Sequence, residues 1–451
     1  MNLTTDPIPK LVRQLAIPAA TGFFFSTMYN IVDTFYAGKL SSEALEALGY
    51  SFAVFFILTA VASGVGQGST ALISNLLGSK NSVGARLMSQ QTIGFGILVG
   101  ITISILGWLS CPFLFKQLRA TGQAYELGLI YMNYILLGSP FFILQGVLNA
   151  SLQSSGDTAS FRNFLIAGFI ANLVLDPWFM FGAFGVPAMG IKGVAIATAG
   201  IQVCGCIYLW IKVKKLDWRR GSTLAELQPR MEKWKEIIEQ GFPASVNMLT
   251  VALGIFVINW FLSGFSKESI AGYIVATRIE QIVLVPTIGF NIAILSLVGQ
   301  NNGAGRLDRV RESWSVSMKY GFFTMLCGGI ALFFLRGPLM KIFTNDPEII
   351  IHGKDYLVVA SITLFAYVIL FQTVFMLQGL KRPAYALWIG LYRQIVAPVS
   401  AFWFLGYYLG WRENGVWWGV FGVTWSAALF TLWYGGNILK KLEAMKALET
   451  K

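Results

Sequence analysis

Charged residues, histidine and cysteine are all scarce in this chain. Of its 451 residues only 12% are charged, one is histidine and four are cysteine. An average soluble domain has about 25% charged residues, so the low charge excludes an ordinary soluble protein. A single histidine excludes metal centres and catalytic sites that need several. The cysteines lie within apolar runs, and Cys204 and Cys206 are two residues apart, which places them on different faces of a helix. We therefore expect neither a disulfide framework nor a zinc site.

Long apolar runs are what the chain has in abundance. Hydrophobic residues make up 55% of it, and the mean hydropathy is +0.62. A helix needs about 20 apolar residues to cross a hydrocarbon core of roughly 30 Å. Runs of that kind cover residues 14–36, 47–77, 89–114, 125–152, 161–182, 190–211, 237–262, 270–298, 319–335, 355–378, 385–410 and 416–439. They are continuous rather than alternating, which favours helices over barrel strands. The expected fold is an all-α integral membrane protein with twelve transmembrane helices.

The second half of the chain repeats the first. Residues that coincide at an offset of 225 are Pro18 with Pro243, Gln153 with Gln378, and Gly190 with Gly415. With a smaller offset, the stretch 78–86 matches 299–306. Six spans return the chain to the side on which it started, so the second repeat enters the membrane in the same orientation as the first. Parallel repeats of this kind are a recurrent design of secondary transporters, with the substrate path between the halves.

The repeat predicts three parts of the chain. We expect an N-terminal six-helix bundle or N-lobe, a basic cytosolic linker, and a C-terminal six-helix bundle or C-lobe. Their expected bounds are residues 1–215, 216–236 and 237–451.

Lysine and arginine are concentrated on one side of the predicted helices. Most of the 34 basic residues fall on the side that holds both ends of the chain, and the positive-inside rule places that side in the cytosol. We expect cytosolic termini and a location in the inner (plasma) membrane. The net charge of +12 is then a signal of orientation, with the lipid bilayer as partner and no nucleic acid. The first apolar run is too long for a signal-peptide core and indicates a retained helix.

Two carboxylates in apolar runs of the first half have no acidic counterpart in the second half. Asp33 and Asp176 fall on Ile258 and Ala401 in the second half. Ionisable residues inside a membrane are costly, so each needs a partner or a function. Because two carboxylates in a low-dielectric bundle cannot both stay ionised cheaply, we expect the pair to hold a proton or a sodium ion. The alternative is that each is a helix-end residue reaching toward the headgroups.

Other polar side chains are spaced to join these acids. Asn172 is four residues before Asp176 and so shares its helix face, and Pro177 is expected to break the helix and free carbonyl groups. Tyr29 and Asn30 precede Asp33 by four and three residues. Further candidates are Tyr131, Gln145, Asn149 and Thr198, for which ordinary hydrogen bonding between helices is the alternative. Pro18 is a candidate hinge of the first helix.

The second half contributes a different polar set, Arg278, Glu280 and Arg393. Arg278 and Glu280 are two residues apart and so point to different faces of their helix. We expect a structural ion-pair network, with contact to substrate as the alternative.

The sequence resembles the multidrug and toxic compound extrusion (MATE) transporters, and among them the DinF-like branch. The resemblance covers nearly the whole chain and is carried by the stretches 32–38 (VDTFYAG), 172–177 (NLVLDP), 195–198 (AIAT) and 297–306 (LVGQNNGAGR). It implies an antiporter that exports organic cations and drugs in exchange for H⁺ or Na⁺ by alternating access. By position, the implied cation site is Asp33, Asn172, Asp176 and Thr198, its polar pocket includes Tyr29, Tyr131, Gln145 and Asn149, and the implied bend is at Pro18.

Two other functions remain open at this point. One is a lipid-linked oligosaccharide flippase of the same superfamily, which would need several arginines for a pyrophosphate. The other is a membrane-embedded enzyme, for which only Asp33 with Asp176 could supply a catalytic pair. We expect a monomeric transporter rather than an enzyme, with no cofactor beyond the coupling ion.

Overall fold

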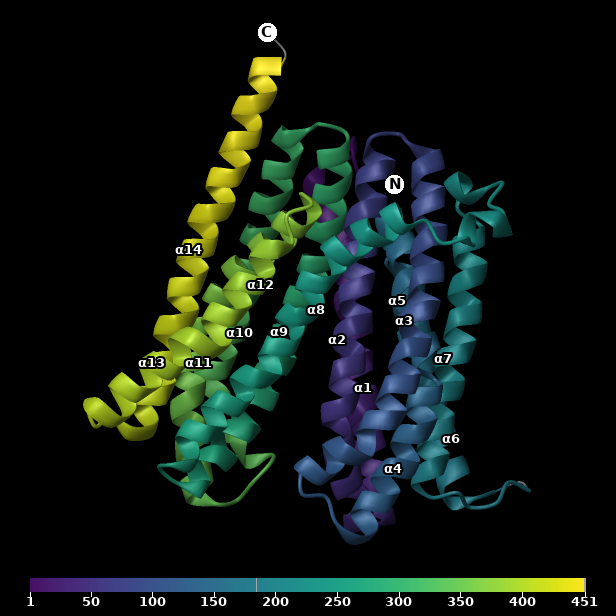
Figure 1. Cartoon of the computed structure of the whole chain (residues 1–451). Helices are drawn as coiled ribbons and strands as arrows, with labels where there is room; N and C mark the ends of the chain where they lie inside the picture. Colours follow the sequence, from purple (N-terminus) through teal and green to yellow (C-terminus); the bar gives the residue numbers. More distant parts are fainter. Residues whose placement is uncertain (184, 450–451) are drawn as a thin grey trace. The chain divides into compact units, whose positions relative to one another are not determined.

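Helices account for nearly all of the structure, a computed structural model that describes residues 1–183 and 185–449 (Figure 1). The first half of the described chain contains α1 (Ile8–Leu40), α2 (Ser42–Gly78), α3 (Ser82–Gln117), α4 (Gly122–Leu137), α5 (Ser139–Ser154), α6 (Ala159–Phe181) and α7 (Ile191–Lys214). Two short 3₁₀ turns, η1 (Asp217–Arg219) and η2 (Leu224–Leu227), follow. The second half contains α8 (Met231–Ser263), α9 (Lys267–Gly303), α10 (Leu307–Lys341), α11 (Pro347–Gly379), α12 (Ala384–Leu391), η3 (Tyr392–Val396), α13 (Ala397–Phe402), η4 (Trp403–Tyr408) and α14 (Arg412–Glu449).

Each predicted apolar run lies in a helical segment. Within the described ranges, ten helices are long and apolar enough to cross a membrane, and the pair α4–α5, bent by 44°, makes an eleventh if it counts as one span. Pro140 near the start of α5 explains the bend, because it has no N–H to donate to the Leu136 carbonyl. The remaining run, 385–410, corresponds to the α12–η4 segment, in which α-helical and π-helical turns alternate. The all-helical membrane fold is therefore confirmed.

The helices pack into two compact units that exchange their leading segments. The first-half unit comprises residues 21–245, and the second-half unit comprises residues 1–20 and 246–451. The start of α1 therefore packs with the second half, and the linker and the start of α8 pack with the first half. The expected parts 1–215, 216–236 and 237–451 describe the sequence repeat and stay a prediction. The packing units have their borders at residues 20/21 and 245/246 instead.

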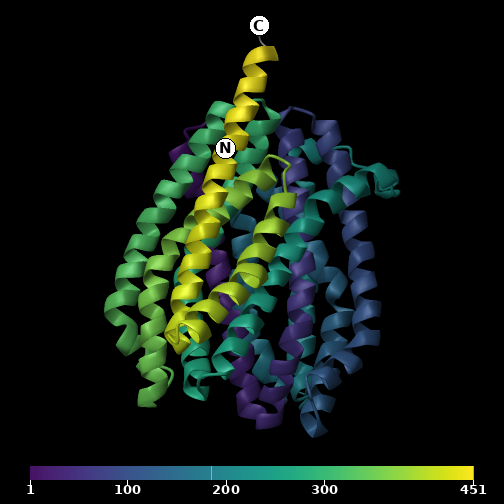
Figure 2. The same ribbon diagram turned by 60° about the vertical axis from the view of Figure 1, so that its left-hand side comes forward.

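Local structure also repeats between the halves. Ser41 caps α2 by accepting a hydrogen bond from the Ala44 N–H at 3.0 Å, and Ser266 caps α9 in the same way from the Ser269 N–H at 3.0 Å. Both residues of the second pair follow those of the first by the 225-residue offset. A serine cap of this kind stabilises a helix start by about 1 kcal/mol. At the other end of the second half, α14 extends past the neighbouring helices of its unit (Figure 2).

The linker between the repeats is held against α3 within the first-half unit. Gln91 on α3 donates to the carbonyls of Glu226 and Gln228 at 2.6 and 2.7 Å and accepts from the Arg230 N–H at 2.9 Å. Arg86 pairs with Glu226 at 3.0 Å. Arg219 is 2% exposed, and this burial lowers the pKa of its guanidinium to about 10. The basic linker is thus a docked element with defined contacts.

Candidate functional site

Two acidic side chains from different helices come together in the first-half unit. Asp33 lies on α1 and Asp176 on α6, and both are buried. Asn172 lies one turn before Asp176 on α6 and donates a hydrogen bond from Nδ2 to Asp33 Oδ1 at 2.8 Å. The face shared by Asn172 and Asp176 is therefore the face that α6 presents to Asp33.

This cluster contains more acceptors than donors. Neither carboxyl oxygen of Asp176 nor the amide oxygen of Asn172 makes a hydrogen bond, although all three are buried. The Asp176 and Asp33 carboxyls also act on each other electrostatically. Two carboxylates cannot hydrogen-bond to each other unless one carries a proton, and a buried acceptor without a donor costs about 1–3 kcal/mol. The arrangement can accept a proton or a small cation that prefers oxygen ligands.

Pro177, beside this cluster, and Pro18, farther back on α1, both lie inside continuous helices. The predicted break at Pro177 is wrong, because α6 continues to Phe181. Pro177 still removes the hydrogen bond to the Leu173 carbonyl, and the Tyr36 hydroxyl of α1 donates to that carbonyl at 3.4 Å. The freed acceptor is thus satisfied by a side chain, so the helix need not end. Pro18 also lies within an unbroken helix, α1, and its role as a hinge stays a prediction.

A second contact joins α1 to α7 beside the acids. The Tyr29 hydroxyl, one turn before Asp33, donates to Thr198 Oγ1 at 3.0 Å. Tyr131 on α4 is buried and interacts electrostatically with both carboxyls. Asn30 is not part of the cluster: it is exposed and donates to the Ser26 carbonyl of its own helix at 2.9 Å. A spacing of three residues rotates Asn30 to the opposite side of Asp33 from Tyr29, which lies four residues away.

The remaining first-half candidates lie on α5. Gln145 donates from Nε2 to Gln202 Oε1 on α7 at 2.6 Å. Gln202 was missed by the sequence analysis, although it lies four residues after Thr198 and so shares the helix face of a predicted site residue. Asn149 is half-buried with no hydrogen bond to its amide oxygen. The polar surface of the unit therefore continues from the acids along α7 and α5.

The expected ion-pair network of the second half is not formed. Glu280 on α9 is 5% exposed, and its Oε2 accepts from the Tyr356 hydroxyl at 2.7 Å, while Oε1 makes no hydrogen bond. Arg278 is exposed. No ion pair in the described residues joins Arg278, Glu280 and Arg393.

Arg393 contacts aromatic rings and makes no ion pair within the described residues, although its charge also acts on Glu280. Its guanidinium lies over the rings of Tyr367 and Phe371, 5.5 and 5.6 Å from their centroids. Arg393 sits in the π-helical turn η3, which ends two residues before Pro398. Because Pro398 cannot donate to the Gln394 carbonyl, a regular α-helical turn is lost there. This turn aims the arginine at the rings, which explains why spacing along one helix did not predict its partner.

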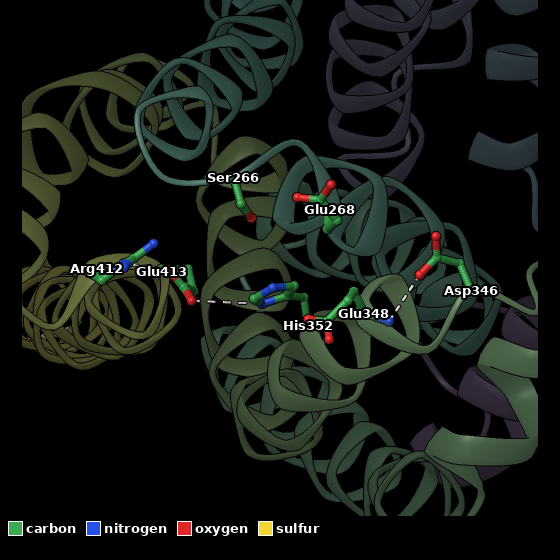
Figure 3. Close-up of a pocket in the computed structure, with 7 residues that line it drawn as sticks. All are labelled: Ser266, Glu268, Asp346, Glu348, His352, Arg412 and Glu413. Carbon is green, nitrogen blue, oxygen red and sulfur yellow. Dashed lines mark hydrogen bonds and ion pairs between the residues drawn. The ribbon is translucent and has the colours of Figure 1, made fainter.

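A separate pocket of about 540 Å³ opens where three helices of the second-half unit begin (Figure 3). Its lining residues are Ser266, Glu268, Asp346, Glu348, His352, Arg412 and Glu413. His352 faces Glu413, with Nδ1 3.9 Å from Oε1. Most of these acids lie in the first turns of α9, α11 and α14, where a carboxylate stabilises a helix N-terminus by about 0.3–1 kcal/mol. That placement accounts for the acidity of the pocket, and the described residues contain no group of three or more acids, histidines or cysteines suited to a metal ion.

Comparison with known proteins supports the duplication. The MatE family model matches this chain twice, over residues 18–178 and 243–403. The two matched segments begin and end 225 residues apart, the offset found in the sequence.

Individual relatives span most of the chain. It is 28% identical over 381 residues to "Probable multidrug resistance protein NorM" of Thermotoga maritima, covering 81% of this chain and 79% of the relative. It is 27% identical over 417 residues to "FAD transporter" of Shewanella oneidensis, covering 90% of each. A solved structure described as the outward-facing conformation of a multidrug resistance MATE family transporter of the MOP superfamily matches with a TM-score of 0.91 at 25% identity, over 98% of each chain.

Proposed function

Because this chain belongs to the MatE family of membrane transporters, we propose that it is a cation-coupled antiporter that exports organic cations and drugs. The family makes it a multi-pass membrane transporter rather than an enzyme. The multidrug resistance relative supports drugs as the exported class. The proposal further places the protein in the inner membrane as a monomer. Both termini lie in the cytosol, as the distribution of lysine and arginine indicates.

The coupling ion is H⁺ or Na⁺ and binds at Asp33, Asn172 and Asp176. The observation that supports this most directly is the surplus of buried acceptor oxygens in this cluster. A bound proton or sodium ion satisfies acceptors that no protein donor reaches. Thr198 and Tyr29 hold α7 to α1 beside the ion, and Tyr131, Gln145 and Asn149 line the adjoining polar surface.

Exchange follows from competition for the same negative charge. One bound ion lowers the charge of the two carboxylates from −2 to −1 and so weakens their attraction for an organic cation. Release of the ion restores the negative charge, which favours binding of the exported cation. Alternating access then requires that the ion-loaded and substrate-loaded forms open to opposite sides.

The test uses purified protein in liposomes loaded with ethidium as the organic cation. A H⁺ gradient and a Na⁺ gradient are imposed separately, and the movement of ethidium is followed by fluorescence. We expect one of the two gradients to drive transport in the wild type and neither to drive it in Asp33→Asn. Transport that is equally fast without any gradient would contradict an antiporter.

An anionic aromatic substrate is the second candidate, and Arg393 favours it. Arg393 over Tyr367 and Phe371 combines a guanidinium with a pair of stacked rings, a combination suited to a ligand that carries both phosphate and a planar ring. The FAD transporter relative is named for such a ligand. Uptake of FAD into the same liposomes, lost in Arg393→Gln but kept in Asp33→Asn, would establish this alternative. The relatives do not favour the flippase.

A further inference from the structure

The helix α1 changes its packing partner within a few residues around Pro18. A methyl group placed on Gly289 of α9 would meet the Ala16 carbonyl oxygen and would lie 3.0 Å from the Ala20 Cβ. Two residues farther along, a methyl group on Gly22 would lie 3.1 Å from the Arg162 Cα of α6. The backbone of α1 is therefore in close contact with α9 up to Ala20 and with α6 from Gly22.

The helix α8 makes the same change 225 residues later. A methyl group on Gly64 of α2 would lie 2.6 Å from the Gly241 carbonyl oxygen and would meet Ser245. Beyond that point Asn247 contacts Gly390. Ala16, Ala20, Gly22 and Gly289 correspond at this offset to Gly241, Ser245, Asn247 and Gly64. We call Gly289 with Ala16 and Ala20 the second-half anchor, and Gly64 with Gly241 and Ser245 the first-half anchor.

Side chains also bind the main chain just before each leading helix. Arg306 donates to the Thr4 carbonyl at 2.9 Å, and Asn301 donates to the Leu3 carbonyl at 3.1 Å. In the other repeat Arg86 donates to the Arg220 carbonyl at 3.1 Å. Arg86 and Arg306 are the last residues of the two matched stretches 78–86 and 299–306. Each leading segment is thus held at two levels, by an arginine before the helix and by an anchor within it.

We propose that the two anchors stay closed throughout the transport cycle and that α1 and α8 change shape only beyond them, from Ala20 to Gly22 and from Ser245 to Asn247. This proposal rests on the transport function inferred above. At each anchor a glycine of one helix lies directly against a main-chain carbonyl oxygen of the other, so a displacement there cannot be taken up by side chains alone. Pro18 lies between Ala16 and Ala20, and Pro243 lies between Gly241 and Ser245. Neither proline can donate to the carbonyl four residues before it, and the border between the packing units follows each proline within three residues.

Electron spin-echo distance measurements test the proposal in the full-length protein. The four native cysteines, all free, are first replaced by serine. One spin-label pair, Lys10→Cys with Ser315→Cys, reports on the second-half anchor, and a second, Lys235→Cys with Val83→Cys, reports on the first-half anchor. All four positions are exposed, and Lys10 and Lys235 are related by the 225-residue offset. A third pair, Lys10→Cys with Lys235→Cys, joins the two packing units.

Each pair is measured at low and high pH, with and without Na⁺, and with ethidium. We expect the unit-joining distance to change with at least one condition, while both anchor distances change by less than about 2 Å, the size of a packing adjustment between helices. A larger shift of either anchor pair in any condition would overturn the proposal, as would a unit-joining distance that stays constant in a protein shown to transport. Which ion moves the unit-joining pair tests the coupling ion separately, so an error there leaves the anchor result intact.

Discussion

At the scale of single residues, the first-half unit buries three acceptor oxygens that no donor reaches, on Asn172 and Asp176. Asparagine in place of an acid would bring its own donors to this cluster and remove a charge. Replacing a functional acid by asparagine should therefore remove transport without lowering stability. Replacing a structural acid in the same way should lower stability.

We predict that Asp33→Asn and Asp176→Asn each abolish ion-driven transport and leave the melting temperature in detergent equal to or above that of the wild type. The double variant should transport no worse than either single one, since residues that form one site are not additive. Transport and thermal unfolding measure the two effects. The matched control is Asp157→Asn in the same unit, where the carboxylate accepts from the Ser160 N–H and hydroxyl at 2.9 and 2.6 Å. This variant should keep transport and nearly all of its stability, because asparagine accepts hydrogen bonds at a helix start about as well as aspartate does. A folding defect in both acid variants would favour a structural role.

The second-half acid gives a related contrast. Tyr356→Phe leaves both oxygens of Glu280 without a donor, so we expect it to destabilise the protein by about 1–3 kcal/mol. Glu280→Gln removes a buried carboxyl that has no cation within ion-pair distance, and it should leave the melting temperature unchanged or higher. Tyr385→Phe is the control, because its hydroxyl bonds only to Thr431 and a neutral pair contributes about 1 kcal/mol. Equal losses in the two tyrosine variants would show that Glu280 has another partner.

Helical spacing predicted which side chains share a face but not which faces meet. It placed Asn172 with Asp176 and Tyr29 with Asp33. In the structure Asn172 bonds to Asp33, and Tyr29 bonds to Thr198. It could not show that Gln145 bonds to Gln202, because that contact depends on how α5 packs on α7. It also failed at Glu280 and Arg393, whose partners are an aromatic hydroxyl and aromatic rings. Opposite charges in a sequence predict an ion pair, but here tyrosines of neighbouring helices are the contacts of both Glu280 and Arg393.

At the scale of elements, proline had two different outcomes that the residue alone does not reveal. Pro140 lies at a 44° bend between helices, whereas α6 passes through Pro177 without a break. The helices α1, α3, α8, α9 and α10 also continue through a proline. A proline in an apolar run therefore does not by itself predict a break in the helix.

The docked linker allows a prediction about protease sensitivity. Gln91→Ala removes three hydrogen bonds that hold residues 226–230 to α3, so we expect trypsin to cut the linker several-fold faster than in the wild type. Band intensity on a gel over time measures the rate. Asp217→Asn is the control, because its ion pair with Arg220 is almost fully exposed and such pairs contribute little. A linker cut equally fast in all three proteins would mean that the contacts to α3 do not protect it.

The glycines at the two anchors should be far less tolerant than glycines facing open space. Gly64→Val and Gly289→Val force two backbones apart, and we expect each to lower stability by about 1–3 kcal/mol or more. Gly200→Val and Gly422→Val are matched controls in other helices, since nothing lies within 4 Å of a methyl group at either position. Melting temperatures of the four variants give the comparison. Truncating Ser245 to alanine should not rescue Gly64→Val, because the Gly241 carbonyl still obstructs it; a full rescue would show that only the side chain matters.

At the scale of the whole molecule, the fold was predictable because composition and periodicity decide it. Continuous apolar runs with few charges fix an all-helical membrane protein, and the 225-residue offset fixes the duplication. The packing borders were not predictable, because the exchange of leading segments involves small residues, Ala16, Ala20, Gly241 and Ser245, that carry no distinctive pattern. Their significance is visible only from Gly64 and Gly289 on the helices they touch.

We predict that neither half of the chain is stable without the other. A fragment ending at Gly221 retains residues 1–20 but lacks α9 and α10, on which they pack, and it also lacks the start of α8. Expressed alone, it should aggregate or be degraded, whereas co-expression with a fragment beginning at Ser222 should allow both to purify together. Size-exclusion chromatography of the fragments measures this. A monodisperse fragment 1–221 with the melting temperature of the full-length protein would refute the exchange of segments.

The burial of the first residues also constrains how the protein is made. Leu3 is 2% exposed, and its carbonyl accepts from Asn301, a residue 298 positions later in the chain. At a synthesis rate of about 5–20 residues per second, the leading segment waits roughly 15–60 s for that partner. All residues of the unit 21–245 have been synthesised once the first part of α8 is made. Residues 1–20 of the other unit can pack only after α9 and α10 have also been synthesised. Residues 1–20 are therefore the first to be synthesised, but they can pack only after the helices of the second half have been made.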